Sequence, residues 1–140
     1  MIEFKCILRR LVNSGSVVVA AAGNDVEIAL TLTSDAKVSF LLSSFPQVFG
    51  VYVIGPWGVI QPDATKIRPE NWMHGEHSAA REIEVSPDAP YKTTMKLSDW
   101  FDIKNAKQFC AGKYVIVVKF YDGGLMKQPV SSNTLELTLK

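Results

Sequence analysis

The chain has 140 residues, of which 47% are hydrophobic and 21% are charged, a balance typical of one globular domain. Its 15 basic and 14 acidic residues give a formal net charge of +1, which creates no electrostatic field to attract nucleic acid or an anionic membrane. A chain of this length buries roughly two-thirds of its unfolded surface, so it needs neither a structural metal nor a disulfide framework, and we expect no cofactor.

The N-terminal segment reads as part of the fold rather than as a targeting signal. Residues 1–11 carry Lys5, Arg9 and Arg10 within their apolar pattern, so they lack the uninterrupted apolar stretch and cleavage site of a secretory signal. No window approaches the roughly 20 apolar residues of a spanning helix. We therefore expect a soluble, cytoplasmic protein without membrane insertion, or an extracellular one if a leader was removed.

Side-chain alternation predicts strands along almost the whole chain. In the first segment Phe4 and Cys6 alternate with Glu3 and Lys5, which is typical of a strand with one buried and one wet face. Turn-forming residues separate the segments. Alternating or apolar segments cover residues 2–9, 16–22, 26–33, 37–42, 48–54, 59–60, 81–85, 92–97, 112–121 and 134–140, and we expect eight or nine strands among them.

Residues 112–121 are the predicted central strand, because they are rich in β-branched and aromatic side chains. One face would carry Tyr114, Ile116 and Val118, and the other Val115 and Val117. Both faces are largely apolar, so we expect both to be covered.

Two hairpins are expected along the chain. Gly55-Pro56-Trp57-Gly58 is a turn between the apolar residues 48–54 and Val59-Ile60, so these segments should pair. The spacing of residues 81–85 and 92–97 predicts a second, hairpin-like pair. Between the hairpins, residues 61–80 have no periodicity and form a loop longer than a compact domain usually keeps.

One short helical corner precedes the central strand. Residues 97–103 combine an N-cap candidate, Ser98, with apolar residues three and four apart, including Trp100 and Phe101 as core residues. Tyr114 then resembles a tyrosine corner, in which the hydroxyl donates a hydrogen bond to backbone a few residues upstream; the alternative is a plain core tyrosine. Together these features predict an all-β, immunoglobulin-like antiparallel β-sandwich with one short helical corner, as a single domain over residues 1–140.

The order of these signals resembles a particular group of sandwiches. The segments 26–33, 97–103, 112–114 and 132–135 look like the immunoglobulin-like β domain that precedes the catalytic part of deuterolysin-type and peptidyl-lysine metallopeptidases. They are also similar to the intracellular proteinase-inhibitor domains of bacteria. The resemblance covers about four-fifths of the chain and concerns structural motifs. The chain has no His-Glu-x-x-His motif, so no catalytic residue is carried over.

Cys6 and Cys110 are the only cysteines, about a hundred residues apart. A bridge between opposite ends of a sandwich would stabilise the fold by roughly 4 kcal/mol in the chain-entropy model. A reducing compartment instead favours two free thiols.

No segment predicts catalysis or a metal centre. The chain has neither a Gly-x-Ser-x-Gly elbow nor a glycine-rich phosphate loop, so we expect that the protein is not an enzyme. His74 and His77 flank a glycine and a carboxylate, but the spacing is not that of a standard zinc site and no third ligand completes it. We interpret this segment as a solvated loop.

Tryptophans in the turn and in the loop point to binding instead. Trp57 at a hairpin tip and Trp72 in the loop have few sequence neighbours to cover them, and interface anchors are enriched in tryptophan. The alternative is that both fold back over the open end of the sandwich. The candidate binding residues are Pro56, Trp57, Gly58, Arg68, Trp72, His74 and His77.

These residues favour a non-catalytic module that recognises another protein, and the inhibitor resemblance implies a protease as that partner, with Pro62 and Pro69 stiffening the loop. A second hypothesis is a structural β-sandwich that forms homo-oligomers through sheet edges, with the C-terminal strand at an edge. A third is a carbohydrate-binding domain or small hydrolase with Trp57 and Trp72 as stacking platforms.

Overall fold

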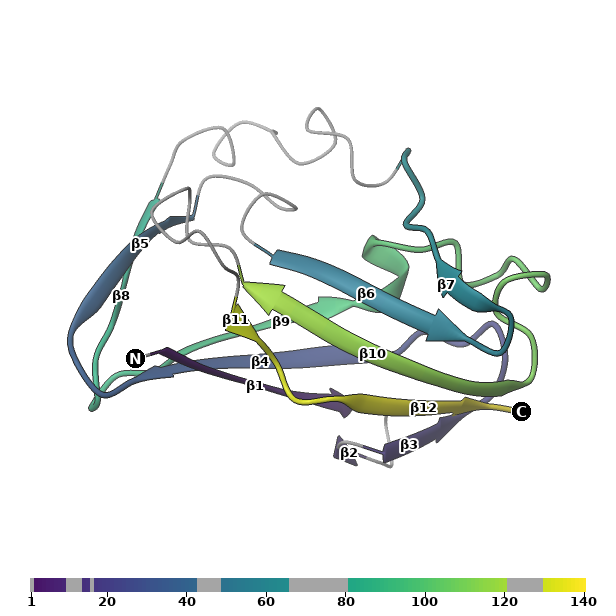
Figure 1. The fold of residues 1–140 in the computed structure, drawn as a ribbon, viewed down its shortest axis with the longest axis horizontal. Coiled ribbons are helices and arrows are strands. Elements are labelled where there is room, and N and C mark those ends of the chain that lie inside the picture. Colours follow the sequence, from purple (N-terminus) through teal and green to yellow (C-terminus); the bar gives the residue numbers. More distant parts are fainter. Residues whose placement is uncertain (1, 10–13, 16, 43–48, 66–80, 121–129) are drawn as a thin grey trace.

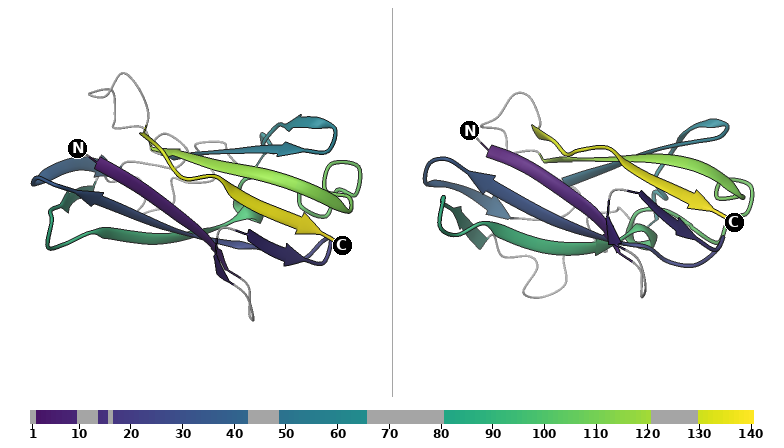
Figure 2. Two further views of the ribbon diagram at one scale, coloured as in Figure 1. Left: turned by 60° about the horizontal axis from the view of Figure 1, so that its bottom comes forward. Right: turned by 90° about the horizontal axis from the view of Figure 1, so that it is seen from below.

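The fold is a sandwich of two sheets with a two-stranded extension at one end (Figure 1). It was obtained as a computed structural model, which describes residues 2–9, 14–15, 17–42, 49–65, 81–120 and 130–140. Figure 2 shows the two layers from the side. The predicted all-β, immunoglobulin-like sandwich is confirmed. No helix in these ranges is long and apolar enough to cross a membrane.

Sheet A forms one layer and is antiparallel throughout. Its strands lie in the order β2 (Ser14–Gly15), β1 (Ile2–Arg9), β4 (Glu27–Ser34) and β9 (Tyr91–Lys96). Its longest pairing is that of β1 with β4, which runs from Ile2↔Ser34 to Arg9↔Glu27. In β4 every second residue is buried, as the alternation predicts.

Sheet B forms the other layer. Its strands lie in the order β3 (Val17–Ala20), β12 (Leu135–Leu139), β10 (Gly112–Phe120), β6 (Phe49–Gly55) and β7 (Gly58–Ile60), and β11 (Val130–Ser131) pairs with the end of β10. β10 is therefore central, as predicted. The C-terminal strand β12 lies between β3 and β10, so its expected position at a sheet edge is wrong.

Sheet C continues sheet A past a bend. Its strands are β5 (Val38–Leu42) and β8 (Arg81–Val85), which turn away from sheet A at one end of the sandwich (Figure 1). The pair Val38↔Val85 lies six residues beyond Leu32↔Tyr91 along both paired segments. The register of the β4–β9 pair therefore continues unbroken into the β5–β8 pair. The predicted pairing of residues 81–85 with 92–97 is wrong, because β8 pairs with β5 and β9 with β4.

The core lies between the two layers. Tyr114, Ile116, Val118 and Phe120 of β10 all face it and are buried. Phe4, Phe49 and Phe120 form an aromatic cluster in which ring centroids are 5.6 to 6.5 Å apart. The other face of β10 is different: the Val115 side chain is 37% exposed, so the expectation that both faces are covered is wrong.

A 3-10 turn, η2 (Leu97–Asp99), forms the predicted corner, and Trp100 and Phe101 after it are buried as expected. The N-cap is Lys96, not Ser98: the Lys96 amide donates to the Asp99 carboxylate over 3.0 Å. Ser98 is instead bound to the carboxylate of Asp25 through its amide and its hydroxyl.

An asparagine side chain joins the two layers. The amide of Cys6 in β1 donates to Asn133 Oδ1 over 2.7 Å, and Asn133 Nδ2 donates to the Cys6 carbonyl over 3.0 Å. The carboxamide lies in the link between β11 and β12, and it thus forms hydrogen bonds with both backbone polar groups of Cys6 in sheet A. Cys6 and Cys110 are both free thiols, in agreement with the unbridged alternative.

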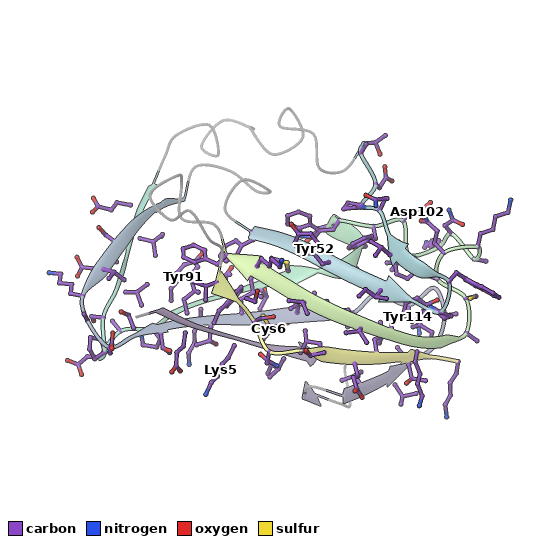
Figure 3. The ribbon with its side chains drawn as sticks, in the orientation of Figure 1. Lys5, Cys6, Tyr52, Tyr91, Asp102 and Tyr114 are labelled. Atoms are coloured by element: carbon purple, nitrogen blue, oxygen red, sulfur yellow. The ribbon has the colours of Figure 1, made fainter. Side chains whose placement is uncertain are left out.

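We predict an alkaline loss of stability that depends on Cys6, whose side chain lies between the layers (Figure 3). Burial raises the pKa of this thiol from its ordinary value of 9.0 to about 12, and a hydrogen bond with Ser132 opposes the shift. Since the folded pKa is the higher one, the stabilisation is complete below pH 9 and declines as the pH rises towards 12.

The expected decline from this one group is about 1.4 kcal/mol of unfolding free energy per pH unit above pH 9. Urea unfolding of the wild type and of Cys6→Ala between pH 8 and pH 11 measures it. The variant should be less stable at pH 8 and should lose stability less steeply above pH 9. Parallel pH profiles for the two proteins would contradict the assignment.

Candidate functional site

The β6–β7 hairpin is the best-defined protruding feature that the sequence singled out. β6 and β7 pair through Val53↔Ile60, Ile54↔Val59 and Gly55↔Gly58, which confirms the predicted hairpin. Pro56 and Trp57 occupy the turn. Gly58 has a φ of +120°, a conformation that side-chain-bearing residues rarely adopt, so glycine is needed where the chain re-enters the sheet.

The proline of this turn lies on the start of the central strand. Gly112 has a φ of +151°, and a Cβ added there would lie 2.7 Å from Cγ of Pro56. That distance is too short for two carbon atoms in contact. The missing side chain at Gly112 therefore makes the space in which the proline ring sits.

Tyr114 anchors the hairpin from below and holds the preceding corner. A Cβ added at Gly55 would lie 2.9 Å from Cε2 of the Tyr114 ring, so the hairpin backbone rests on that ring. The Tyr114 hydroxyl donates to the carbonyl of Cys110 over 2.6 Å and lies 3.2 Å from that of Gln108. The predicted tyrosine corner is thus confirmed, and Figure 3 shows Tyr114 at the same end of the sandwich as the β6–β7 turn.

The surroundings of Tyr114 are apolar and rigid. Its ring stacks on Phe109 with centroids 5.6 Å apart, and Phe109 meets Phe101 edge-on at 5.9 Å. Burial, followed by the hydrogen bond to Cys110, raises the pKa of Tyr114 above its ordinary value, so the phenol stays neutral and donates.

The chain that leaves the hairpin is also tied down. Ile60 is buried, and the amide of Asp63 donates to the carbonyl of Trp100 over 2.8 Å. Asp63 Oδ1 in turn accepts from the amide and the hydroxyl of Thr65. Both sides of the hairpin and its turn therefore have contacts that fix its direction.

Trp57 at the tip of this fixed hairpin is 85% exposed. The alternative that it folds back over the open end of the sandwich is therefore wrong for Trp57. A large apolar side chain on a rigid support binds with little loss of conformational entropy, which favours its use as a contact.

The exposed apolar surface continues from the tip onto the outer face of sheet B. Val59 is 67% exposed, Ile54 52% and Tyr52 43%. The register places Val59, Ile54 and Val115 side by side across β7, β6 and β10. Lys119 lies over the Tyr52 ring, with Nζ 5.0 Å from its centroid. We call this set of residues, Tyr52, Ile54, Val59 and Val115, the outer apolar face.

The structure locates three of the seven predicted binding residues, Pro56, Trp57 and Gly58, and places them together at the hairpin tip. Arg68, Trp72, His74 and His77 lie outside the described residues, as does Pro69.

Sequence reasoning missed the outer apolar face. The sequence contains a sign of it, since residues 48–54 and 115–118 are apolar at both odd and even positions, and therefore on both faces of their strands. For residues 112–121 this pattern predicts a strand covered on both sides, because periodicity alone does not tell a covered second face from an exposed one.

Among the described residues, no group of three or more His, Cys, Asp or Glu side chains lies together. Neither a comparison with protein-family models nor one with curated proteins finds a match to this chain.

We predict that filling the space at Gly112 displaces the hairpin. Gly112→Ala should cost about 1–3 kcal/mol of unfolding free energy from overpacking against Pro56, beyond the strain of its φ. In a Pro56→Ala background, where Cγ is absent, the same substitution should cost less. Urea unfolding of the four proteins measures this coupling.

Gly23→Ala is the matched control, because Gly23 also has a positive φ, +85°, but open space around its Cβ position. It should show only the backbone strain and no coupling to Pro56. Equal costs of Gly112→Ala in both backgrounds would show that the ring does not occupy this space.

Proposed function

We propose that the protein is a non-catalytic recognition module that contacts another protein through the β6–β7 tip, Pro56, Trp57 and Gly58. The observation that carries this proposal is the 85% exposure of Trp57 on a hairpin held by Gly112 and Tyr114. Interface anchors are enriched in tryptophan, and a preorganised contact keeps more of its binding energy.

A protein partner suits this tip better than a sugar does. The described neighbours of Trp57 on its hairpin are the exposed apolar side chains of Val59 and Ile54. A sugar site needs polar groups that bind hydroxyls beside the aromatic platform, and such a partner is not supplied by these two residues. Apolar side chains beside an aromatic anchor are typical of the core of a protein interface.

The resemblance to proteinase-inhibitor domains makes a protease the first partner class to test. In that version the anchored segment that begins at Pro62 and Asp63 would position the following loop, and Arg68, Trp72, His74 and His77 would complete the contact. The hydrogen bond from Asp63 to Trp100 supports an anchored start for that loop.

The test is site-specific photo-cross-linking in cells that produce the protein. A benzophenone side chain replaces Trp57 in one variant and Asp88, exposed in the turn between β8 and β9, in the other. We expect a discrete cross-linked protein from position 57 and none from position 88. No adduct at position 57, or the same adducts from both positions, would contradict the proposal.

Purified serine, cysteine and metalloproteases, titrated with the protein at micromolar concentration, test the protease version. Inhibition that Trp57→Ala weakens about tenfold or more supports it. Absence of inhibition across the panel removes the protease as partner and leaves the cross-linked protein to be identified.

A further inference from the structure

The exposed apolar side chains are concentrated on one face of one sheet. Among the described residues, the large hydrophobic side chains with high exposure are Ile7, Val19, Tyr52, Ile54, Trp57, Val59 and Val115. Val19, Tyr52, Ile54, Val59 and Val115 belong to strands of sheet B, and the pairing registers place them on its outer side, opposite the buried Tyr114, Ile116 and Val118; Trp57 lies in the β6–β7 turn of the same sheet. Contiguous apolar patches of this kind mark interaction surfaces.

The edge strands β9 and β7 are protected, whereas this face is not. The edge strand β9 presents the exposed Lys92 and Lys96, and charged residues of this kind prevent edge pairing. The edge strand β7 has three residues and is soon followed by Pro62, which has no amide to donate. Association through these two edges is therefore less favourable than docking on the outer apolar face.

We propose that a second copy of this chain covers the outer face of sheet B, packing sheet against sheet in a two-fold dimer. The two proposals share Ile54 and Val59, but this one does not need Trp57 or the partner of the proposed function, so each can fail without the other. Protein sheets with apolar faces pack about 10 Å apart at about 30° to one another, and sheets A and B of this molecule are stacked in the same manner (Figure 2).

The size of the face suits a weak dimer. Its five strands have 4, 5, 9, 7 and 3 residues, and at about 3.3 Å per residue and about 4.8 Å between strands they cover roughly 450 Å² of flat area. This is less than the roughly 800 Å² that each partner buries in a standard interface and lies in the range of weak, transient ones.

Two charged residues on the face, Glu136 and Lys119, complement each other across a two-fold axis, whereas the exposed Lys113 at the start of β10 has no such counterpart. Glu136 on β12 is opposite Val115, and Lys119 lies four residues further along β10. A two-fold interface makes every contact twice. We place the two-fold axis between the two faces, near Val117 of both copies. In this arrangement Glu136 of each copy lies against Lys119 of the other copy, and Val115 of each copy lies against Tyr52 of the other. The net charge of +1 adds little long-range repulsion between copies.

Sedimentation equilibrium of the whole chain, from about 1 to about 300 μM, tests the dimer. The wild type should be a dimer at the upper end of this range. Ile54→Glu should raise the dissociation constant of the dimer about 100-fold or more, because it buries an unpaired carboxylate between the faces. The control Ile7→Glu, at an apolar side chain of similar exposure on sheet A, should leave it unchanged, and thermal unfolding confirms that both variants are folded.

A charge swap tests the geometry. Glu136→Lys and Lys119→Glu should each weaken association by setting like charges together, and the double variant should restore it. A wild type that stays monomeric at 300 μM would overturn the proposal, as would equal effects of the Ile54 and Ile7 variants. A dimer without rescue in the double variant would overturn the two-fold arrangement proposed here.

Discussion

The buried Tyr114 is the residue on which the rest of this end of the molecule depends. Its ring supports the hairpin backbone at Gly55, and its hydroxyl donates to Cys110 at the corner that leads into β10. An unmade hydrogen bond in the core costs about 1–3 kcal/mol, so the hydroxyl and the two carbonyl groups near it specify one position for the corner. Because Gly112 follows directly and receives Pro56, the corner also determines where Trp57 is presented.

The two sides of sheet B differ in exposure. The inner side, from Tyr114 to Phe120, completes a core that the alternating residues of sheet A close from the other side. The outer side keeps Ile54, Val59 and Val115 partly in contact with solvent, so part of their apolar surface stays unburied in the single chain. Apolar residues that a fold does not bury are informative because surfaces of this kind belong to interfaces.

The sequence predicted the elements better than their partners. Alternation located the strands, and the pattern around Tyr114 predicted both the corner and its hydrogen bond, because these features are local. The partner of residues 81–85 was predicted wrongly, since pairing with β5 is non-local and follows from the unbroken register past the bend. The hairpin tip was found from its turn residues, whereas exposure of the face at Val115 depends on what the rest of the chain leaves uncovered.

Amide hydrogen exchange of Tyr114→Phe tests the central role of this residue most directly, because the substitution keeps the ring and removes only the hydroxyl. Loss of the bond to Cys110 should speed exchange about tenfold at Gln108 and Phe109 in the corner and in the hairpin at Ile54 and Ile60, while the β1–β4 ladder stays as in the wild type. Unchanged exchange in both the corner and the hairpin would contradict the account.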